Sequence, residues 1–392
     1  MNREQKYLIQ LSAAYLNSEK AHLNEDVSLG ALMNEAAKHN LFSVAYCALM
    51  QSENSGQIAA GNVSARYQAL FTDGIYNANL TMMVYEELKS ALTGAEIRFV
   101  PFKGAVLREL YPVPETRTMG DVDVLIDADR RKDAKDALEK AGFTCVNSNG
   151  PVWDYDKNGI RAEVHTSFVN GKTGNNNAVE YFSGAIKKAC FSGYEGRFDD
   201  NYHFEYLIAH LAHHFCFYGA GIRMVLDLAV MLKFRNIDIN TVISDLEKAG
   251  LDKFAKNILT VCRKWYGVGV DFKAETEKTE EFLASHGVFG FSNRNISAVI
   301  ERKDMEDGKK SGKFRTRLRL LFPPYKKLKE IPYIKFIENR PYLTPFAWVY
   351  RFFYNLKNKR EFMMSAVKGL SDESAKAQAQ SELEFFEEIG LA

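Results

Sequence analysis

The spacing of apolar residues divides the chain into helical and mixed regions. Residues 1–92 carry apolar positions at intervals of three and four, as in "LGALMNEAAKHNLFSVAYCALM" and "YQALFTDGIYNANLTMMVYEELKSAL". This spacing predicts helices with one apolar face. The same spacing returns from residue 202 in "YHFEYLIAHLAHHFCFYGAGIRMVLDLAVMLKF". The pattern therefore predicts a helical N-terminal lobe over 1–92 and a helical C-terminal lobe over 201–392.

Residues 93–200 have a different sequence pattern, in which short β-rich runs alternate with short predicted helices. "EIRFVPF" and "DVDVLI" are typical of strands, and "GAVLRELY" between them predicts a two-turn helix. A helix is expected in "DADRRKDAKDALEKAGF", with Asp127 as its N-terminal cap and Gly142 at its end. "VWDYD" and "IRAEVHTSF" flank Asn158-Gly159, which favours a type I′ hairpin turn. This order of elements predicts an α+β core.

Composition and charge exclude some classes of protein but do not indicate a specific function. The 51 basic and 50 acidic residues nearly cancel, so net charge does not indicate a polyanionic partner. Five dispersed cysteines without a CxxC pair favour a reducing cytosol. We find no signal-peptide pattern and no run of about 18 uncharged apolar residues. These features predict a cytoplasmic protein without a transmembrane segment.

Two aspartates on one predicted strand are the first candidates for chemistry. Asp121 and Asp123 share one face of the strand, because alternate side chains point the same way. Two carboxylates held together repel one another unless a cation or a proton intervenes, and Mg²⁺ prefers such oxygen ligands. The acid-x-acid pattern also occurs by chance, for example at Asp127/Asp129.

A third acid-x-acid pair occurs in "DYDKNG", which begins like a calcium-binding loop. Position twelve of that loop is His165 instead of glutamate, and no helix precedes it. We therefore expect a plain hairpin turn there.

Neighbouring residues strengthen the case for Asp121 and Asp123. Lys103-Gly104 begins a short helix directly after a strand, where free backbone N–H groups can receive an anion. Downstream, Glu163 lies on a neighbouring strand, with Arg161 and His165 on its face. An anion site next to three carboxylates is the set that two-metal phosphoryl transfer uses.

The stretches "FKGAVLRELYP", "TRTMGDVDVLI" and "EVH" together resemble the uncharacterised bacterial nucleotidyltransferase-like family of the polymerase-β superfamily. The resemblance covers most of the chain, although the flanking segments are less specific. It implies a nucleotidyltransferase fold for residues 93–200 and transfer of a nucleoside monophosphate from a triphosphate such as ATP, with release of pyrophosphate. It also implies two Mg²⁺ ions, or Mn²⁺, held by Asp121, Asp123 and Glu163. Nucleotide binding would fall to Lys103, Gly104, Arg117 and Gly120.

One position departs from the superfamily pattern. Serine follows the helix-initiating glycine in most of the superfamily, whereas this chain has Ala105. Without that hydroxyl, phosphate contact passes to backbone N–H groups and Lys103. The alternative function is therefore a catalytically degenerate module that binds a nucleotide or a partner.

The helical C-terminal region offers further candidates. His210, His213 and His214 lie on one helix face, so they either line the pocket, pack in the core or, with Asp227, bind the metal of a phosphohydrolase. Arg223 and Asp227, four residues apart, predict an intrahelical ion pair or a role in ordering the site.

The stretch 309–329 is locally basic and either forms a solvated surface or contacts an anionic partner such as RNA, lipid or a phosphorylated acceptor. The sequence leaves the acceptor open between a small molecule, a sugar phosphate, RNA and a protein.

Overall fold

The structure is a computed structural model, which describes residues 1–22, 27–53, 55, 62–169, 177–287, 322–329, 331–337, 339–358 and 374–391. The chain divides into two compact units, Met1–Ser292 and Asn293–Ala392. The further division at residues 92 and 200 stays a prediction. Six basic residues of the stretch 309–329 lie outside the described residues: Lys309, Lys310, Lys313, Arg315, Arg317 and Arg319.

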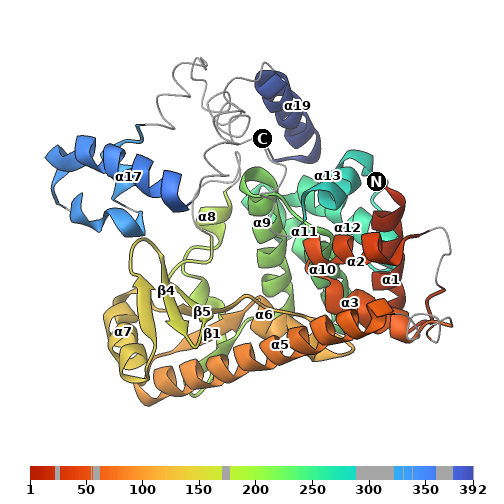
Figure 1. Ribbon diagram of the computed structural model, residues 1–392, viewed down its shortest axis with the longest axis horizontal. Coiled ribbons are helices and arrows are strands. Elements are labelled where there is room, and N and C mark those ends of the chain that lie inside the picture. The colour runs from red at the N-terminus through yellow and green to blue at the C-terminus, as the bar shows by residue number, and fades with distance from the viewer. Residues whose placement is uncertain are drawn as a thin grey trace. The chain divides into compact units, whose positions relative to one another are not determined.

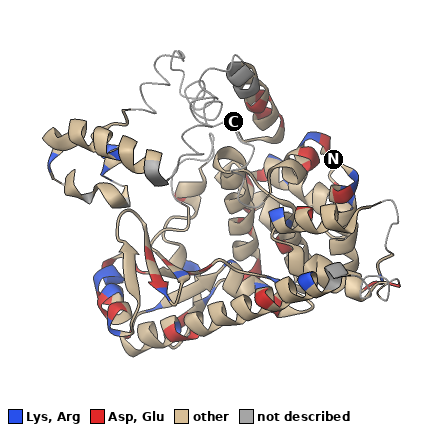
Figure 2. Cartoon of the chain, in the orientation of Figure 1, with Lys and Arg blue, Asp and Glu red and all other residues tan. Residues whose placement is uncertain are grey.

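Helices form where the apolar spacing predicts them at the start of the first unit. They are α1 (Arg3–Asn17), α2 (Leu29–Lys38), α3 (Phe42–Met50) and the long α5 (Asn62–Gly94). Asn2 and Gln5 close a capping box on α1, and the Ser28 hydroxyl accepts from the backbone of α2. Acidic and basic residues are interspersed over these helices (Figure 2).

The first unit contains a seven-stranded mixed sheet with strand order β3-β4-β5-β2-β1-β7-β6. The strands are β1 (Phe99–Phe102), β2 (Asp121–Ile126), β3 (Thr144–Asn147), β4 (Val152–Lys157), β5 (Ile160–His165), β6 (Cys190–Ser192) and β7 (Glu195–Arg197). β2 lies between antiparallel β1 and parallel β5. The register of β2 and β5 places Asp121 opposite Arg161 and Asp123 opposite Glu163.

The two faces of this sheet differ in chemistry. Val122, Val124 and Ile126 point into an apolar core with Leu88 of α5 and Leu138 of α7 (Arg131–Lys140). In Figure 1, α5 runs the length of the sheet on this side. Because side chains alternate along a strand, Asp121 and Asp123 point to the opposite face. We call this second face the site face; it carries Asp121, Asp123, Arg161, Glu163 and His165.

Short helices and a helical layer complete the first unit. The short elements are α6 (Gly104–Leu107), η1 (Arg108–Leu110), η2 (Pro114–Thr116), η3 (Ala128–Arg130), α8 (Ala178–Tyr181) and η4 (Ala185–Lys188). The helical layer contains α9 (Asp200–Phe217), α10 (Ile222–Phe234), α11 (Ile239–Ala249), α12 (Asp252–Tyr266) and α13 (Glu277–His286). The helical run from residue 202 is broken between α9 and α10, where Gly219 has a φ of +91°.

The second unit contains α16 (Tyr325–Leu328), η5 (Pro332–Ile337), η6 (Pro341–Leu343), α17 (Thr344–Asn358) and α19 (Ser374–Ile389). Leu328, Ile334, Ile337 and Ala347 form its small apolar core. In the described parts of both units, no helix combines the length and the apolar character needed to cross a bilayer.

Two local predictions have opposite outcomes. The hairpin turn is confirmed, since Asn158 and Gly159 have positive φ angles of 55° and 79°, as a type I′ turn requires. The predicted cap at Asp127 is wrong. Its side chain makes no capping hydrogen bond and instead accepts from Arg98 Nη2 at 2.9 Å, while a 3₁₀ turn separates it from α7. The ion pair with Arg98 thus takes the carboxylate that would have capped the helix.

Gly196 of β7 has no room for a side chain. A Cβ atom there would lie 2.6 Å from Phe191 and 2.9 Å from Val100. We expect Gly196→Ala to lower the free energy of unfolding in urea by about 1–3 kcal/mol through overpacking. Gly94→Ala is the matched control, because nothing lies within 4 Å of its added Cβ, and it should leave stability unchanged or slightly raised. Equal losses in the two variants would contradict this account.

Candidate functional site

A cavity of about 640 Å³ opens beside the site face of the sheet, and its walls include residues of α6, α9 and α10. Every candidate site residue predicted from the sequence lines it: Lys103, Gly104, Arg117, Gly120, Asp121, Asp123, Arg161, Glu163, His165, His210, His214, Arg223 and Asp227. The volume falls in the range of small-molecule sites. The fold therefore brings together residues that are up to about 120 positions apart in the sequence.

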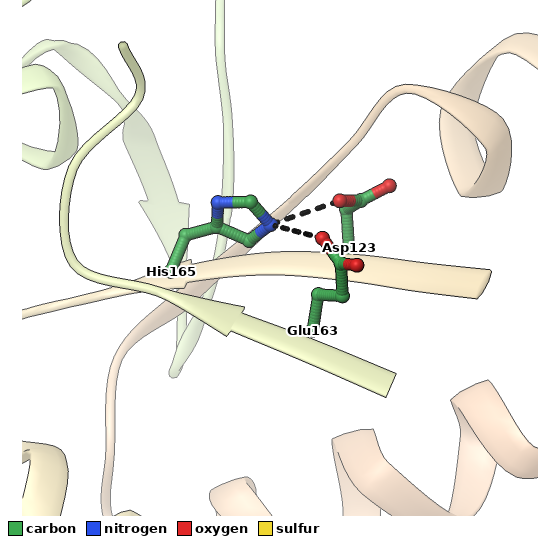
Figure 3. Close-up of side chains that lie close together, drawn as sticks. All are labelled: Asp123, Glu163 and His165. Carbon is green, nitrogen blue, oxygen red and sulfur yellow. Dashed lines mark hydrogen bonds and ion pairs between the residues drawn. The ribbon is translucent and has the colours of Figure 1, made fainter. Parts of the chain in front are cut away.

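Asp123 contacts two other candidate site residues. Its Oδ1 accepts a hydrogen bond from Lys103 Nζ at 2.7 Å and lies 2.9 Å from His165 Nε2. The same His165 nitrogen is 3.3 Å from Glu163 Oε2 (Figure 3). Asp123 is only 2% exposed. Two carboxylates and two nitrogens thus meet where β2 and β5 run side by side.

The turn between β1 and α6 holds Lys103 in an unusual backbone conformation. Its φ is +52°, in a region that side-chain-bearing residues rarely adopt. Its backbone N–H donates to His203 Nε2 at 3.3 Å. Next to it, a Cβ at Gly104 would lie 2.6 Å from Met119 Sδ and 3.0 Å from Arg117 Nη1, so only glycine fits. The tight turn places the Lys103 ammonium beside the carboxylates, while α6 itself is a single turn.

Electrostatics separate the two aspartates of β2. Burial raises the pKa of Asp123, but Lys103 and His165 outweigh it and lower that pKa to about 2. Asp121 lacks such contacts, and burial together with the charge of Asp123 raises its pKa to about 6. Burial disfavours the His165 cation, yet hydrogen bonds to Asp123 and Glu163 raise its pKa. The cluster therefore holds a persistent negative charge at Asp123.

A second buried network orders the loop before β2. Arg117 Nε and Nη2 donate to the two oxygens of Asp227, each at 2.9 Å, and Tyr111 Oη donates to Asp227 Oδ1 at 2.8 Å. The predicted intrahelical pair between Arg223 and Asp227 is wrong, because this fork–fork pair takes both carboxylate oxygens. Arg223 Nη1 instead donates to the carbonyl of Thr118 at 3.2 Å. Arg117 therefore ties the loop before β2 to α10.

His210 and His214 of α9 line the cavity, and burial there favours the neutral form of each ring. The rings of His210 and His214 are 4.6 Å apart. Burial lowers the pKa of both, that of His214 to about 4. Among the described residues they belong to no cluster of three potential metal ligands, and Asp227 is engaged by Arg117. This arrangement gives no support to a metal site on α9.

Two residues of α9, Tyr206 and His203, contribute to the site although no sequence motif predicts them. Tyr206 lines the cavity and packs on Phe102 at 5.4 Å between ring centroids. His203 holds the strained turn at Lys103. Their spacing of three or four residues from His210 or from each other places them on a shared side of the helix, which is the only sequence signal they carry.

The calcium-loop interpretation of "DYDKNG" has no counterpart in the structure. Asp154 Oδ1 accepts from Arg161 Nη2 at 2.8 Å, and its strand pairs fully with β5. These contacts belong to a hairpin, as the turn chemistry predicts.

The donor atoms at the centre of the site suit a divalent cation. Ligand atoms of Asp123, Glu163 and His165 lie within 4.8 Å of one another. Carboxylate oxygens are the ligands that Mg²⁺ prefers, and an added imidazole is also compatible with Mn²⁺. This group differs in one member from the predicted set, since His165 stands where Asp121 was expected; Asp121 lies on the same face and lines the cavity.

Comparison with known proteins adds the family. No curated protein and no solved structure matches the chain. A family model described as an uncharacterised nucleotidyltransferase matches residues 25–267, which is more than half of the chain and includes every side chain of the cavity discussed above. The α+β architecture agrees with a nucleotidyltransferase core. The chain belongs to this uncharacterised nucleotidyltransferase family.

Proposed function

We propose that the protein transfers a nucleoside monophosphate from a nucleoside triphosphate to an acceptor and releases pyrophosphate, with Mg²⁺ or Mn²⁺ as its metal. The observation that carries this proposal is the pairing of Asp123 with Glu163 on neighbouring parallel strands, next to Lys103 in a cavity of about 640 Å³. The family supports the class of reaction. We propose the nucleoside triphosphate substrate and the acceptor from the residues of the site.

Asp123 and Glu163 would hold the metal, assisted by His165 or Asp121. When bound, such ions lower the pKa of an attacking hydroxyl and neutralise charge on the leaving group. Asp123 suits this role because its pKa of about 2 keeps it ionised at neutral pH. Glu163 also has a lowered pKa, because its hydrogen bond to His165 outweighs burial.

Positive charge for the triphosphate comes from two side chains of the cavity wall. Lys103 carries an ammonium whose pKa is raised, because Asp123 outweighs the effect of burial. Arg223 reaches the same cavity. Its guanidinium can pair with the phosphates of an anionic substrate through charge-assisted hydrogen bonds. We assign both residues to phosphate binding, with Gly104 and Gly120 allowing close backbone approach.

The neutral imidazoles of His210 and His214 face the acceptor side in this proposal. Each can donate or accept one hydrogen bond at neutral pH. With Tyr206 they form a wall suited to a hydroxyl-bearing acceptor. The acceptor would be a small molecule, or the end of a larger one that enters the cavity.

Ala105 favours a second candidate, a nucleotide-binding module without turnover. The residue is 7% exposed at the mouth of α6 and supplies no hydroxyl to a phosphate. In this case Asp123 and Lys103 would bind a metal–nucleotide complex without reaction.

Thermal shift and pyrophosphate release with each of the four ribonucleoside triphosphates distinguish the candidates. We expect at least one triphosphate to raise the melting temperature only when Mg²⁺ or Mn²⁺ is present, because binding to the native state stabilises it. Pyrophosphate release in the presence of a panel of acceptors then supports the transferase. Binding without release supports the module, especially if Ala105→Ser restores turnover. No shift with any triphosphate overturns both.

A further inference from the structure

The helix α17 in the second unit turns its apolar residues outward. Its outward surface, together with Tyr342 just before it, carries large apolar side chains that are all exposed, and we call it the aromatic face: Tyr342, Phe346, Val349, Tyr350, Phe352, Phe353 and Leu356. Tyr342 is 72% exposed, Phe346 68% and Phe353 62%. Positions 346, 349, 350 and 353 follow the three-and-four spacing of one helix face. The exposed residues therefore form a continuous surface.

The opposite side of α17 packs inward, where Ala347 and Trp348 join the small apolar core of this unit. Ala347 is fully buried, and Asn355 is 7% exposed, where its Oδ1 accepts from Tyr333 Oη at 2.9 Å. The aromatic face departs from the usual pattern of a surface helix, whose outward side is polar. A contiguous apolar surface of this kind marks an interaction site.

The segment around the aromatic face has a net positive charge, which favours an anionic partner. Residues 322–358 contain seven Lys or Arg and two Glu, a net charge of +5, whereas the whole chain has +1. Lys326, Lys329 and Arg340 are exposed in the structure. In Figure 2 the ribbon of α17 is largely tan. A second copy of this surface would place like charges opposite one another, which opposes self-association.

We propose that α17 binds the surface of a membrane rich in anionic phospholipid, with the aromatic face inserted between headgroups and acyl chains. Aromatic side chains prefer this boundary, and basic residues beside them are attracted to anionic headgroups. The 15 residues of α17 span about 22 Å, which is shorter than a hydrocarbon core of about 30 Å. The helix therefore lies in the plane of the surface. This proposal is independent of the reaction proposed above, although it would bring that reaction to acceptors at a membrane.

Vesicle flotation of the full-length chain tests the proposal. We expect binding to vesicles of phosphatidylcholine with about one third phosphatidylglycerol to exceed binding to pure phosphatidylcholine by about tenfold at an ionic strength of about 0.1 M, and to weaken at high salt. The double variant Phe346→Ser/Phe353→Ser should lose this binding by about tenfold or more. The reversal Lys326→Glu/Arg340→Glu should remove the preference for anionic vesicles.

The matched control is Tyr76→Ser/Met83→Ser on α5, where two large apolar side chains are 67% and 62% exposed outside the aromatic face. This control should bind vesicles like the wild type, and all variants should keep the wild-type circular dichroism spectrum. Three results would overturn the proposal: no binding to either vesicle, binding that the Phe346/Phe353 variant retains, or a dimer that this variant dissociates while vesicles bind nothing. Binding to a protein or RNA partner in place of vesicles would also overturn it.

Discussion

Replacing Asp123 by asparagine is expected to reduce pyrophosphate release by about three orders of magnitude, because several kcal/mol of charge stabilisation depend on this carboxylate. Asparagine keeps the shape of the side chain and removes its negative charge. Lys103 Nζ and His165 Nε2, both within 2.9 Å of Asp123 Oδ1, would then face a neutral amide. Steady-state pyrophosphate release with the preferred triphosphate measures the loss.

Asp129→Asn is the matched control for this variant. It removes an aspartate from the same kind of acid-x-acid pair, but Asp129 is exposed and lies outside the cavity. It should therefore keep wild-type turnover. Urea unfolding of both variants separates lost chemistry from lost fold. A folded Asp123→Asn protein that keeps more than about a tenth of wild-type turnover would contradict the role of Asp123.

Local features of the fold are predicted correctly from the sequence. The alternation in "DVDVLI" predicted one apolar and one acidic face, and β2 has both. Asn158-Gly159 predicted the turn that joins β4 to β5. These features succeed because they depend on neighbours in sequence, through side-chain alternation and turn conformation. The cap at Asp127 failed because a distant residue, Arg98, competes for its carboxylate.

Contacts between residues that are far apart along the chain could not be predicted from the sequence in this way. Arg117 and Asp227 are 110 positions apart and pair only because α10 packs near the loop before β2. The helical spacing of Arg223 and Asp227 predicts that these two residues pair with each other. Local spacing carries no information about Arg117, which is the residue that pairs with Asp227. Likewise, His165 lies two residues beyond Glu163 on the same face, but its contact with Asp123 depends on the register of β2 against β5.

The pair between Arg117 and Asp227 provides the second large prediction. Asp227→Asn is expected to lower the free energy of unfolding by about 3–5 kcal/mol, because it leaves the Arg117 cation buried without its counter-charge. Arg117 and Asp227 side chains are only 6% and 10% exposed. Urea unfolding at neutral pH measures the loss. The exposed control Glu139→Gln, whose carboxylate lies 3.7 Å from Lys135, should cost less than about 0.5 kcal/mol.

The dependence of this loss on pH distinguishes a charge effect from a packing effect. Burial raises the pKa of Asp227, but Arg117 and Arg223 outweigh it, so the folded-state pKa is lowered. A lowered pKa stabilises the fold above the unfolded-state value of about 3.9, and this stabilisation is lost as the pH falls toward the folded-state pKa. The difference between wild type and Asp227→Asn should therefore be largest near pH 7 and shrink below about pH 4.

A double variant completes the test of this pair. Arg117→Met/Asp227→Leu removes both charges, so it should recover part of the stability that Asp227→Asn loses, since no buried ion remains unpaired. It should not recover turnover, because Arg117 also lies against Gly104, where its Nη1 is 3.0 Å from the position of a Cβ, and so holds the turn that carries Lys103. Equal stability of Asp227→Asn and wild type across the pH range would show that the pair contributes nothing to the fold. Full turnover in the double variant would show that the loop before β2 does not need the Arg117–Asp227 pair to order the site.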